Sequence, residues 1–353
     1  MEGTLAMKRF NPALVAFIPV FLAFAPAAPG QPQLVLPDPS PKASASQTVG
    51  LSEFTVTYHR PGVNKRKVWG SLVPWGETWR AGANENTTLS ASTPFTFGGK
   101  AVPAGTYGVH MLPAEGEWTV ILSSQAKAWG SFSYDQKEDV VRVAVKPEPA
   151  DFVERLSFTF DDPANDATAL ALRWEKLRVA VPITVDTKKV TLDSIREQLR
   201  GLPRFSWQGW NQAASWCVRN DVTTDEAFAW ADRSISMQKT FPNLRTKAAL
   251  LEKKGDAKAA AALRAEALPL AREADVNALG YQLLADGKTA EAVEYFRKNV
   301  KEHPQSWNVW DSLAEGLRTS GDAKGARENY EKALAMAPED QKARIRGELA
   351  KLK

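Results

Sequence analysis

The feature that most constrains this chain is a change in its hydrophobic period near Asp186. Before that residue, apolar and polar side chains alternate, as in residues 156–160, which is typical of strands with one buried face. After it, apolar residues recur every three or four positions, as in residues 192–199, which is typical of amphipathic helices. We therefore predict an α+β protein of two domains, with a β-domain over residues 45–186 and an all-α domain over residues 187–353.

The predicted β-domain consists of short strands with no helix between them. Turn signals such as Pro61-Gly62, Gly98-Gly99 and Asp161-Asp162-Pro163 recur at short intervals between the alternating segments. Short alternating strands joined by such turns favour antiparallel sheets. We expect an antiparallel β-sandwich or barrel.

The helical half contains an internal repeat. Four alanines follow one another at spacings of 33, 32 and 34 residues: Ala227, Ala260, Ala292 and Ala326. A period of about 34 residues is typical of tetratricopeptide repeats, in which each unit is a pair of helices. The last unit resembles that motif at Trp310, Leu313, Leu317, Ala326, Tyr330, Ala333 and Pro338. We expect a tetratricopeptide-like helical array.

The first residues have the pattern of a secretory signal peptide. Lys8 and Arg9 precede an apolar stretch over residues 13–25, and small residues follow. Residues 1–30 are therefore predicted to be a signal peptide, with either Met1 or Met7 as the start. An uncleaved anchor is the alternative.

The predicted mature chain begins with a linker rich in Pro, Ala and Ser over residues 31–44. A lipoprotein needs a cysteine at the cleavage site, and the single cysteine is Cys217. We expect an exported protein, periplasmic or extracellular, that is not a lipoprotein and has no stable membrane anchor after cleavage.

The composition excludes several classes of protein. The net charge of +4 is too small to predict a nucleic-acid partner without a localised basic patch. One cysteine provides neither a disulfide framework nor a multi-cysteine metal site. The chain carries no Walker loop and no G-x-S-x-G motif. We predict no catalytic residues, no cofactor and no metal.

The predicted β-domain resembles a bacterial exported family known as domain of unknown function 2911. The resemblance rests on residues 46–50 (SQTVG), 57–63 (TYHRPGV), 72–86 (LVPWGETWRAGANEN), 102–108 (VPAGTYG), 117–121 (EWTVI) and 173–176 (RWEK). A segment similar to residues 206–214 (SWQGWNQAA) also follows the β-domain in members of that family. The resemblance implies a β-domain joined to helical repeats, and it implies no reaction.

One segment of the β-domain combines side chains suited to a ligand. Trp79 would stack on a planar or sugar-like group, Arg80 would make a bidentate contact, and Asn84 and Glu85 would supply hydrogen bonds. In the alternative interpretation, Arg80 and Glu85 form an ion pair that ties a loop to the domain.

Two further residues belong to the same predicted ligand site, namely Arg60 and His110. The strand pattern places His59 and His110 on the polar side of their strands, so we expect both to face solvent. With Glu85 they would make a three-ligand metal site only if their strands were adjacent, and no metal-ligand spacing supports that.

The inner groove of the two best repeats is the second candidate site. Its residues are predicted to be Asn277, Tyr281, Asp311, Glu315 and Arg318, a set of mixed charge. Tetratricopeptide-like repeats resemble protein-interaction scaffolds. We predict a non-catalytic protein that recruits a protein or peptide partner through its helical repeats.

The sequence leaves two alternatives to this function. The first alternative is that the β-domain binds, or even hydrolyses, a small molecule or carbohydrate through the Trp79–Glu85 loop. The second alternative is that the array simply packs on the β-domain.

Overall fold

The computed structural model describes residues 36–352, so the predicted signal peptide lies outside the described residues. The N-terminal part of the described chain is all β except for a short 3-10 turn, Gln136–Glu138. Its strands are β1 (Lys42–Val49), β2 (Ser52–His59), β3 (Thr88–Ala91), β4 (Phe95–Phe97), β5 (Lys100–Val102), β6 (Gly105–Leu112), β7 (Trp118–Ser123), β8 (Asp139–Val145), β9 (Glu148–Asp161) and β10 (Ala167–Thr184).

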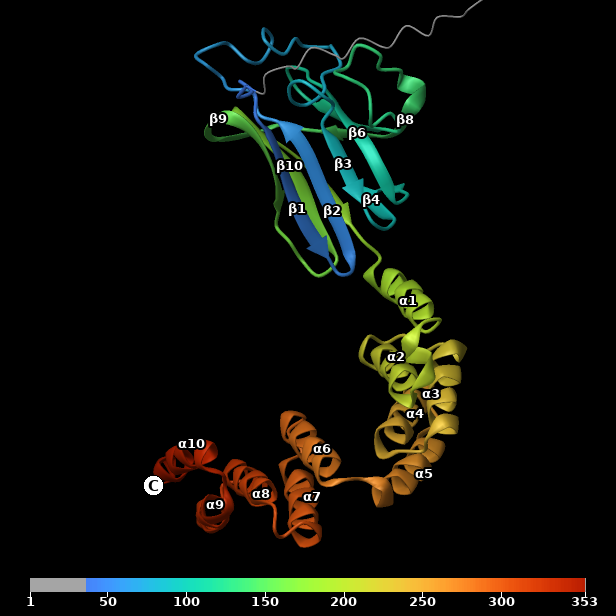
Figure 1. Cartoon of the computed structure of the whole chain (residues 1–353), viewed down its shortest axis with the longest axis vertical. Coiled ribbons are helices and arrows are strands. Elements are labelled where there is room, and N and C mark those ends of the chain that lie inside the picture. Colours follow the sequence, from blue (N-terminus) through green and yellow to red (C-terminus); the bar gives the residue numbers. More distant parts are fainter. Residues whose placement is uncertain (1–35, 353) are drawn as a thin grey trace, which may run out of the picture.

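The strands form two antiparallel sheets. One sheet has the order β1-β2-β3-β6-β7-β8 and the other has the order β5-β4-β10-β9 (Figure 1). A single cluster of buried apolar side chains takes members from both sheets, for example Val109 and Leu122 from the first and Leu172 and Trp174 from the second. The β-domain is therefore a sandwich rather than a barrel, and the α+β fold class predicted from the sequence is confirmed.

The chain becomes a strand earlier than the sequence suggested. β1 begins at Lys42, inside the segment expected to be a linker. Residues 42–44 pair with residues 57–59 of β2, and farther along the strand Ser46 Oγ lies 2.8 Å from Thr55 Oγ1. The start of β1 is therefore set by pairing with the alternating strand β2, and not by the composition of residues 42–44.

The helical half begins directly after β10. The Asp186 side chain accepts a hydrogen bond of 2.9 Å from the Lys189 amide and so caps the first helix. The helices are α1 (Thr187–Gln198), α2 (Trp207–Arg219), α3 (Asp225–Met237), α4 (Phe241–Lys254), α5 (Ala257–Ala267), α6 (Glu273–Ala285), α7 (Thr289–Glu302), α8 (Trp307–Thr319), α9 (Ala323–Met336) and α10 (Glu339–Lys351), with 3-10 turns at Leu202–Phe205 and Leu268–Leu270.

Helices α2 to α9 pack as successive antiparallel pairs, and the pairs follow one another along a curved array (Figure 1). The four repeat alanines lie on the second helix of each pair and are fully buried: Ala227, Ala260, Ala292 and Ala326. Small residues are needed there because the two helices of a pair approach closely. At Gly280 in α6, a Cβ atom would overlap the ring of Phe296 in α7. The predicted helical array is confirmed.

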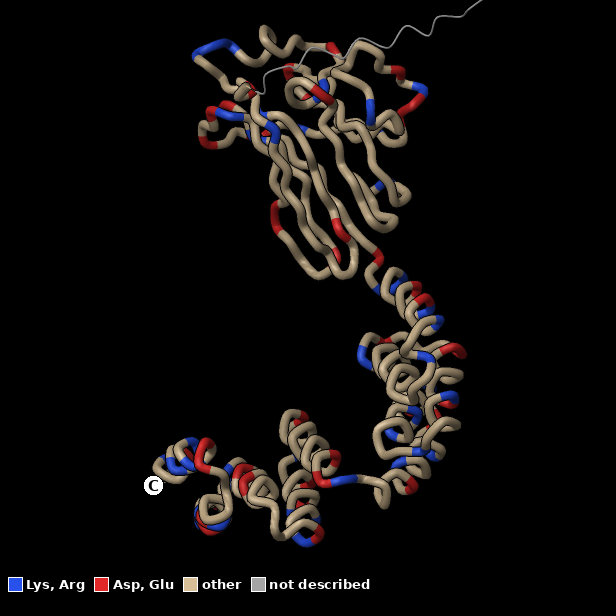
Figure 2. Tube along the Cα trace, in the orientation of Figure 1, with Lys and Arg blue, Asp and Glu red and all other residues tan. Residues whose placement is uncertain are grey.

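Two features of the surface concern possible partners. No helix within residues 36–352 is long and apolar enough to cross a membrane. Figure 2 shows Lys and Arg interspersed with Asp and Glu along the helices, which is the arrangement of solvated helix faces.

Candidate functional site

Trp79, the predicted stacking residue, is partly buried and packs against the core of the sandwich. Its backbone exchanges two hydrogen bonds of 2.8 Å with Met111 in β6. Its ring stacks on Trp174, with centroids 5.9 Å apart, and meets Trp69 edge to face at the same distance. The indole N–H donates to the Gly82 carbonyl at 3.2 Å. Both the ring and its polar atom already have partners within the domain.

Arg80 points away from this cluster. Its guanidinium carbon lies 6.0 Å from the centroid of the Trp129 ring, and burial lowers the pKa of Arg80. Its Nε is buried without a hydrogen-bond acceptor among residues 36–352. The Trp129 ring above it is 59% exposed and stacks on Phe132 at a centroid distance of 5.8 Å. This cation is therefore held by an aromatic ring rather than by a carboxylate.

The ion pair between Arg80 and Glu85, considered from the sequence, does not form. Glu85 Oε2 lies instead 3.3 Å from Nε2 of His59, at the end of β2. The backbone turns at Ala81 and Asn84, where φ is 51° and 55°, and these turns carry Glu85 towards β2. The partner of Glu85 depends on the path of the loop.

Two further residues of the predicted ligand site, Arg60 and Asn84, make hydrogen bonds within the protein. Arg60 Nε donates to the Leu156 carbonyl at 3.0 Å and so links β2 to β9. Asn84 Nδ2 donates to Asp38 Oδ2 at 2.7 Å on the surface. Arg60 thus bonds to the backbone of β9 and Asn84 bonds to Asp38, and neither contact favours a bound small molecule or carbohydrate.

The expectation that His59 and His110 face solvent is wrong. The loop after β7 covers His110, which is 2% exposed, and Ser131 Oγ lies 3.0 Å from its Nδ1. Burial lowers the pKa of His110 more than the nearby Asp139 raises it. His59 is also buried, and β3 separates its strand from that of His110. Within the described residues, no three His, Cys, Asp or Glu side chains converge as metal ligands.

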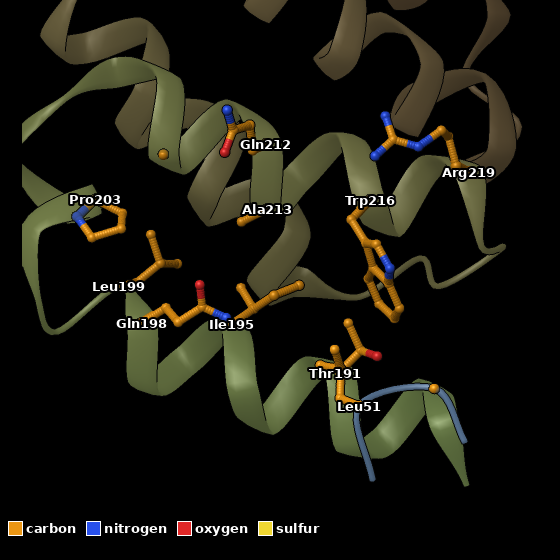
Figure 3. A pocket seen from close by; sticks show the side chains of 12 residues that line it. Leu51, Thr191, Ile195, Gln198, Leu199, Pro203, Gln212, Ala213, Trp216 and Arg219 are labelled. Atoms are coloured by element: carbon orange, nitrogen blue, oxygen red, sulfur yellow. The ribbon is translucent and has the colours of Figure 1, made fainter. Parts of the chain in front are cut away.

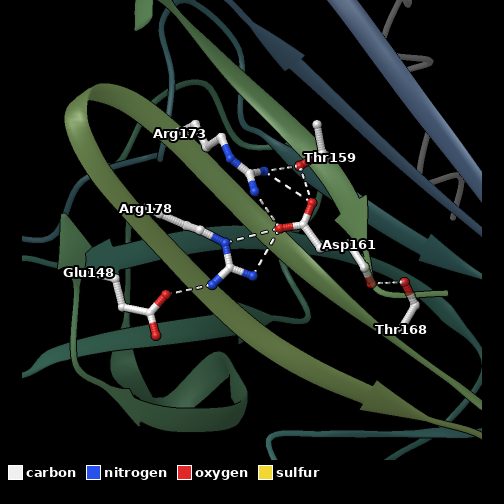
Figure 4. Close-up of polar contacts among 6 residues, drawn as sticks. All are labelled: Glu148, Thr159, Asp161, Thr168, Arg173 and Arg178. Carbon is white, nitrogen blue, oxygen red and sulfur yellow. Dashed lines mark hydrogen bonds and ion pairs between the residues drawn. The ribbon is translucent and has the colours of Figure 1, made fainter. Parts of the chain in front are cut away.

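A polar cluster on the four-stranded sheet is structural (Figure 4). Arg173 makes two hydrogen bonds with Asp161, of 3.0 and 2.7 Å, and Arg178 adds a third of 3.0 Å. Arg178 also bonds to Glu148 at 2.7 Å. Burial alone would raise the pKa of Asp161, but the hydrogen bonds from Arg173, Thr159 and Arg178 outweigh it and lower the pKa to about 2. Two arginines and two carboxylates neutralise one another across β9 and β10.

The predicted partner groove is occupied by contacts within the array. Tyr281 in α6 donates to Glu315 in α8 at 3.0 Å, and Arg318 lies 3.7 Å from the same carboxylate. Asp311 accepts a hydrogen bond of 2.8 Å from Arg344 in α10. The structure therefore brings Tyr281, Glu315 and Arg318 together, while Asp311 pairs with Arg344 of the last helix.

A more open groove lies over the preceding helices. A pocket of about 470 Å³ spans α2, α4 and α6, and its lining includes Arg219, Arg245, Ala249, Ala278 and Gln282. Burial lowers the pKa of Arg245, and the charge of Arg264 lowers it further. Its nearest ring is Phe241, with the guanidinium carbon 5.4 Å from the centroid. Among residues 36–352, no carboxylate forms an ion pair with Arg245.

Sequence reasoning missed Arg245, although a signal for it exists. Arg245, Asn277 and Asp311 each precede the repeat alanine of their own unit by fifteen residues. The prediction used only the two best-matching repeats, so it included Asn277 and Asp311 and stopped one unit too early. Asn277 Oδ1 is itself buried without a hydrogen-bond partner in the described chain.

A second pocket lies where the two domains meet (Figure 3). It has a volume of about 620 Å³ and lies between α1 and α2, under the tip of the β1–β2 hairpin. Ile195 and Trp216 form its apolar walls, Leu51 comes from the hairpin tip, and Arg219 lies at one end. We call this cavity the junction pocket and the pocket over α2, α4 and α6 the groove pocket.

Residues 40–183 match the model of the family described as Protein of unknown function (DUF2911), which confirms the resemblance of the β-domain. No curated protein matches the chain.

Similar solved structures include proteins described as TPR proteins. They include the C-terminal part of a TPR repeat-containing protein from Cytophaga hutchinsonii (16% identity, TM-score 0.30), of which the match covers 58%, against 42% of this chain. MamA from Desulfovibrio magneticus RS-1 matches with 15% identity and a TM-score of 0.29, over 41% of this chain and 82% of that one. YrrB, described as a TPR protein with an unusual peptide-binding site, matches with 16% identity and a TM-score of 0.28, over 46% of this chain and 84% of that one.

Proposed function

We propose that this chain, in which a DUF2911 domain is joined to a curved helical array, is an exported, non-catalytic scaffold. It recruits a protein or peptide partner through the concave face of the array, in the periplasm or outside the cell. The observation that carries the proposal is the groove pocket, which is lined by the first helices of three successive pairs and contains Arg245 without a carboxylate partner among the described residues.

The partly buried charge of Arg245 lowers the stability of the isolated protein. A guanidinium taken partly out of water loses hydration, and that loss is normally compensated by a carboxylate or by hydrogen bonds. Glu252 and Glu291 act on Arg245 only at longer range, and Glu252 is itself paired with Arg264. A partner that places an acceptor over Arg245 would supply the missing compensation, and arginine is prominent at the energetic centres of interfaces.

The export part of the proposal rests on the sequence of the leader. The basic pair Lys8 and Arg9, the apolar stretch after it and the small residues that follow are the three parts of a signal peptide. Fractionation of the native host checks this part: a shortened chain in the soluble envelope fraction is expected, and full-length chain in the cytoplasm would reject export.

Site-directed cross-linking tests the binding part. The photo-reactive amino acid p-benzoylphenylalanine replaces Ala249 in the groove pocket or, as a control, the exposed Lys258 on α5. Position 249 is expected to cross-link one partner from an envelope extract, and position 258 is not. The purified partner should then bind the wild-type chain and bind the Arg245→Ala variant at least tenfold more weakly. Equal binding of both chains would reject the groove as the recruiting surface.

A further inference from the structure

We infer that the β-hairpin tip and the helical array form one composite site for an acidic linear peptide. An apolar side chain of the peptide fills the junction pocket, and carboxylates that follow it contact Arg219 and then Arg245. This inference rests on the proposed function, which it deepens by naming the chemistry of the partner segment.

The junction pocket suits an apolar side chain. Thr191 and Ile195 of α1 face Ala213 and Trp216 of α2 across it, as Figure 3 shows. Burial of one aliphatic or aromatic side chain between such walls contributes about 1.5–3 kcal/mol. The lining includes no acidic residue, and its one charged residue is Arg219.

Leu51 makes the β-domain part of this site. A turn between strands normally carries polar residues, yet Leu51 is a leucine that is 51% exposed at the tip of the β1–β2 hairpin. Gly50 beside it has a φ of 60°, and a Cβ there would lie 2.7 Å from Cγ2 of Thr187 at the start of α1. The close approach of this glycine to Thr187 brings the hairpin tip against α1, where Leu51 lines the pocket.

The two pockets share one lining residue, Arg219. This residue lies one helical turn after Trp216 on α2. A peptide that leaves the junction pocket at the Arg219 end would pass over Arg219 and reach Arg245 in the groove pocket. Two neighbouring pockets that share a residue fit an extended peptide rather than a compact small molecule.

The charges of this path select an acidic peptide. Arg219 donates only to the hydroxyl of Ser215, at 2.8 Å, and makes no ion pair within residues 36–352. The acidic residue of the groove pocket, Asp275, is already paired with Arg272 at 3.1 Å. The exposed Arg219 and the half-buried Arg245 therefore line the path without an ion-pair partner in the described chain, and both can make charge-assisted hydrogen bonds to carboxylates.

Fluorescence anisotropy with synthetic peptides tests the inference on the full mature chain. The probe is a short fluorescein-labelled peptide with one leucine followed by glutamates, compared with peptides in which lysines replace the glutamates or serine replaces the leucine. The acidic peptide with leucine should bind most tightly and should bind more weakly as the salt concentration rises. The lysine peptide should not bind.

Matched variants separate the two contacts. Arg219→Gln should weaken binding of the acidic peptide about tenfold, while Arg233→Gln, at an exposed position on α3, should not. Leu51→Ser should weaken binding about fivefold, while Phe152→Ser, at a residue that is 54% exposed on β9, should not. Circular dichroism of each variant confirms that it is folded.

The outcomes distinguish this inference from the proposed function. Equal affinity for acidic and basic peptides, no binding of either at millimolar concentration, or unchanged binding by Leu51→Ser would overturn the composite acidic-peptide site. If cross-linking at position 249 still identifies a partner that depends on Arg245, the scaffold function stands and only the peptide chemistry is wrong. If that cross-linking also fails, both proposals fall.

Discussion

Trp79 stacks on Trp174, with ring centroids 5.9 Å apart and ring planes that differ by 18°. The contact joins the long loop before β3 to the longest strand of the opposite sheet. The tryptophan chosen from the sequence as a ligand contact therefore packs this loop against the core of the sandwich. The role of Trp79 can therefore be tested by measuring the free energy of unfolding.

Replacement of Trp79 by alanine is expected to destabilise the β-domain by roughly 3 kcal/mol, because it removes ring contacts to Trp174 and Trp69 and leaves a cavity. Guanidinium chloride unfolding of the mature chain measures the loss. Trp129→Ala is the control, because that ring is 59% exposed, and it should change the free energy of unfolding by less than about 1 kcal/mol. Similar small effects of both substitutions would contradict the core role of Trp79.

The architecture was predictable because it follows from local periodicity. The alternation within residues 156–160 predicted a strand with one buried face, and Leu156 and Phe158 are buried. The repeat alanines predicted close helix pairs, and they are fully buried as well. A period of two residues in a strand, or of about 34 residues in the repeat, is visible in the sequence because equivalent positions contact the same kind of neighbouring residue.

The functional surfaces were less predictable because they depend on contacts between distant segments. No local pattern shows that Leu51 reaches α1, since this depends on the length of a hairpin and on the direction in which α1 leaves β10. The pairing of Glu85 with His59 likewise depends on the path of a loop. Parity placed His110 on the outer face correctly, but it carried no information on the loop that covers that face.

Gly280→Ala is expected to destabilise the helical array by about 2 kcal/mol, because the added methyl group would overlap the ring of Phe296. Gly347 in α10 is the matched control, since a Cβ there meets no atom within 4 Å. Gly347→Ala should raise the free energy of unfolding by about 0.5–1 kcal/mol, because alanine favours a helix interior. Thermal unfolding followed by circular dichroism distinguishes the two. An equal gain from both would mean that the helix pair tolerates a side chain at position 280.

The cluster around Asp161 predicts a specific loss of stability in acid. Its pKa is about 2 in the folded protein, below the ordinary 3.8, so the unfolded chain binds the proton more readily. The stabilisation by Asp161 is therefore complete above about pH 4 and is lost as the pH falls from 3.8 towards 2. Urea unfolding over this range should show the decline.

Asp161→Asn should lower the free energy of unfolding at pH 7 by roughly 1–2 kcal/mol and should flatten its decline between pH 4 and 2, because the titrating carboxylate is gone. The neighbouring Asp162→Asn is the control, since Asp162 is exposed and asparagine tolerates its φ of 49°. If Asp162→Asn flattens the acid profile as much as Asp161→Asn, the arginine cluster is not the source of the pH dependence.

Arg245 predicts opposite effects on stability and on binding. Its charge is partly buried without a carboxylate partner in the described chain, so an apolar side chain of similar length removes a desolvation cost. Arg245→Met is expected to leave the array as stable as the wild type or up to about 1 kcal/mol more stable, while it lowers the affinity for the acidic peptide at least tenfold.

Arg264→Met is the control. It breaks the ion pair with Glu252, and residue 264 lies on the second helix of its pair. It should not increase stability and should reduce peptide affinity much less. A loss of stability in Arg245→Met would mean that the arginine serves the fold through its contact with Phe241, and the groove would then lose the residue that marks it as a binding surface.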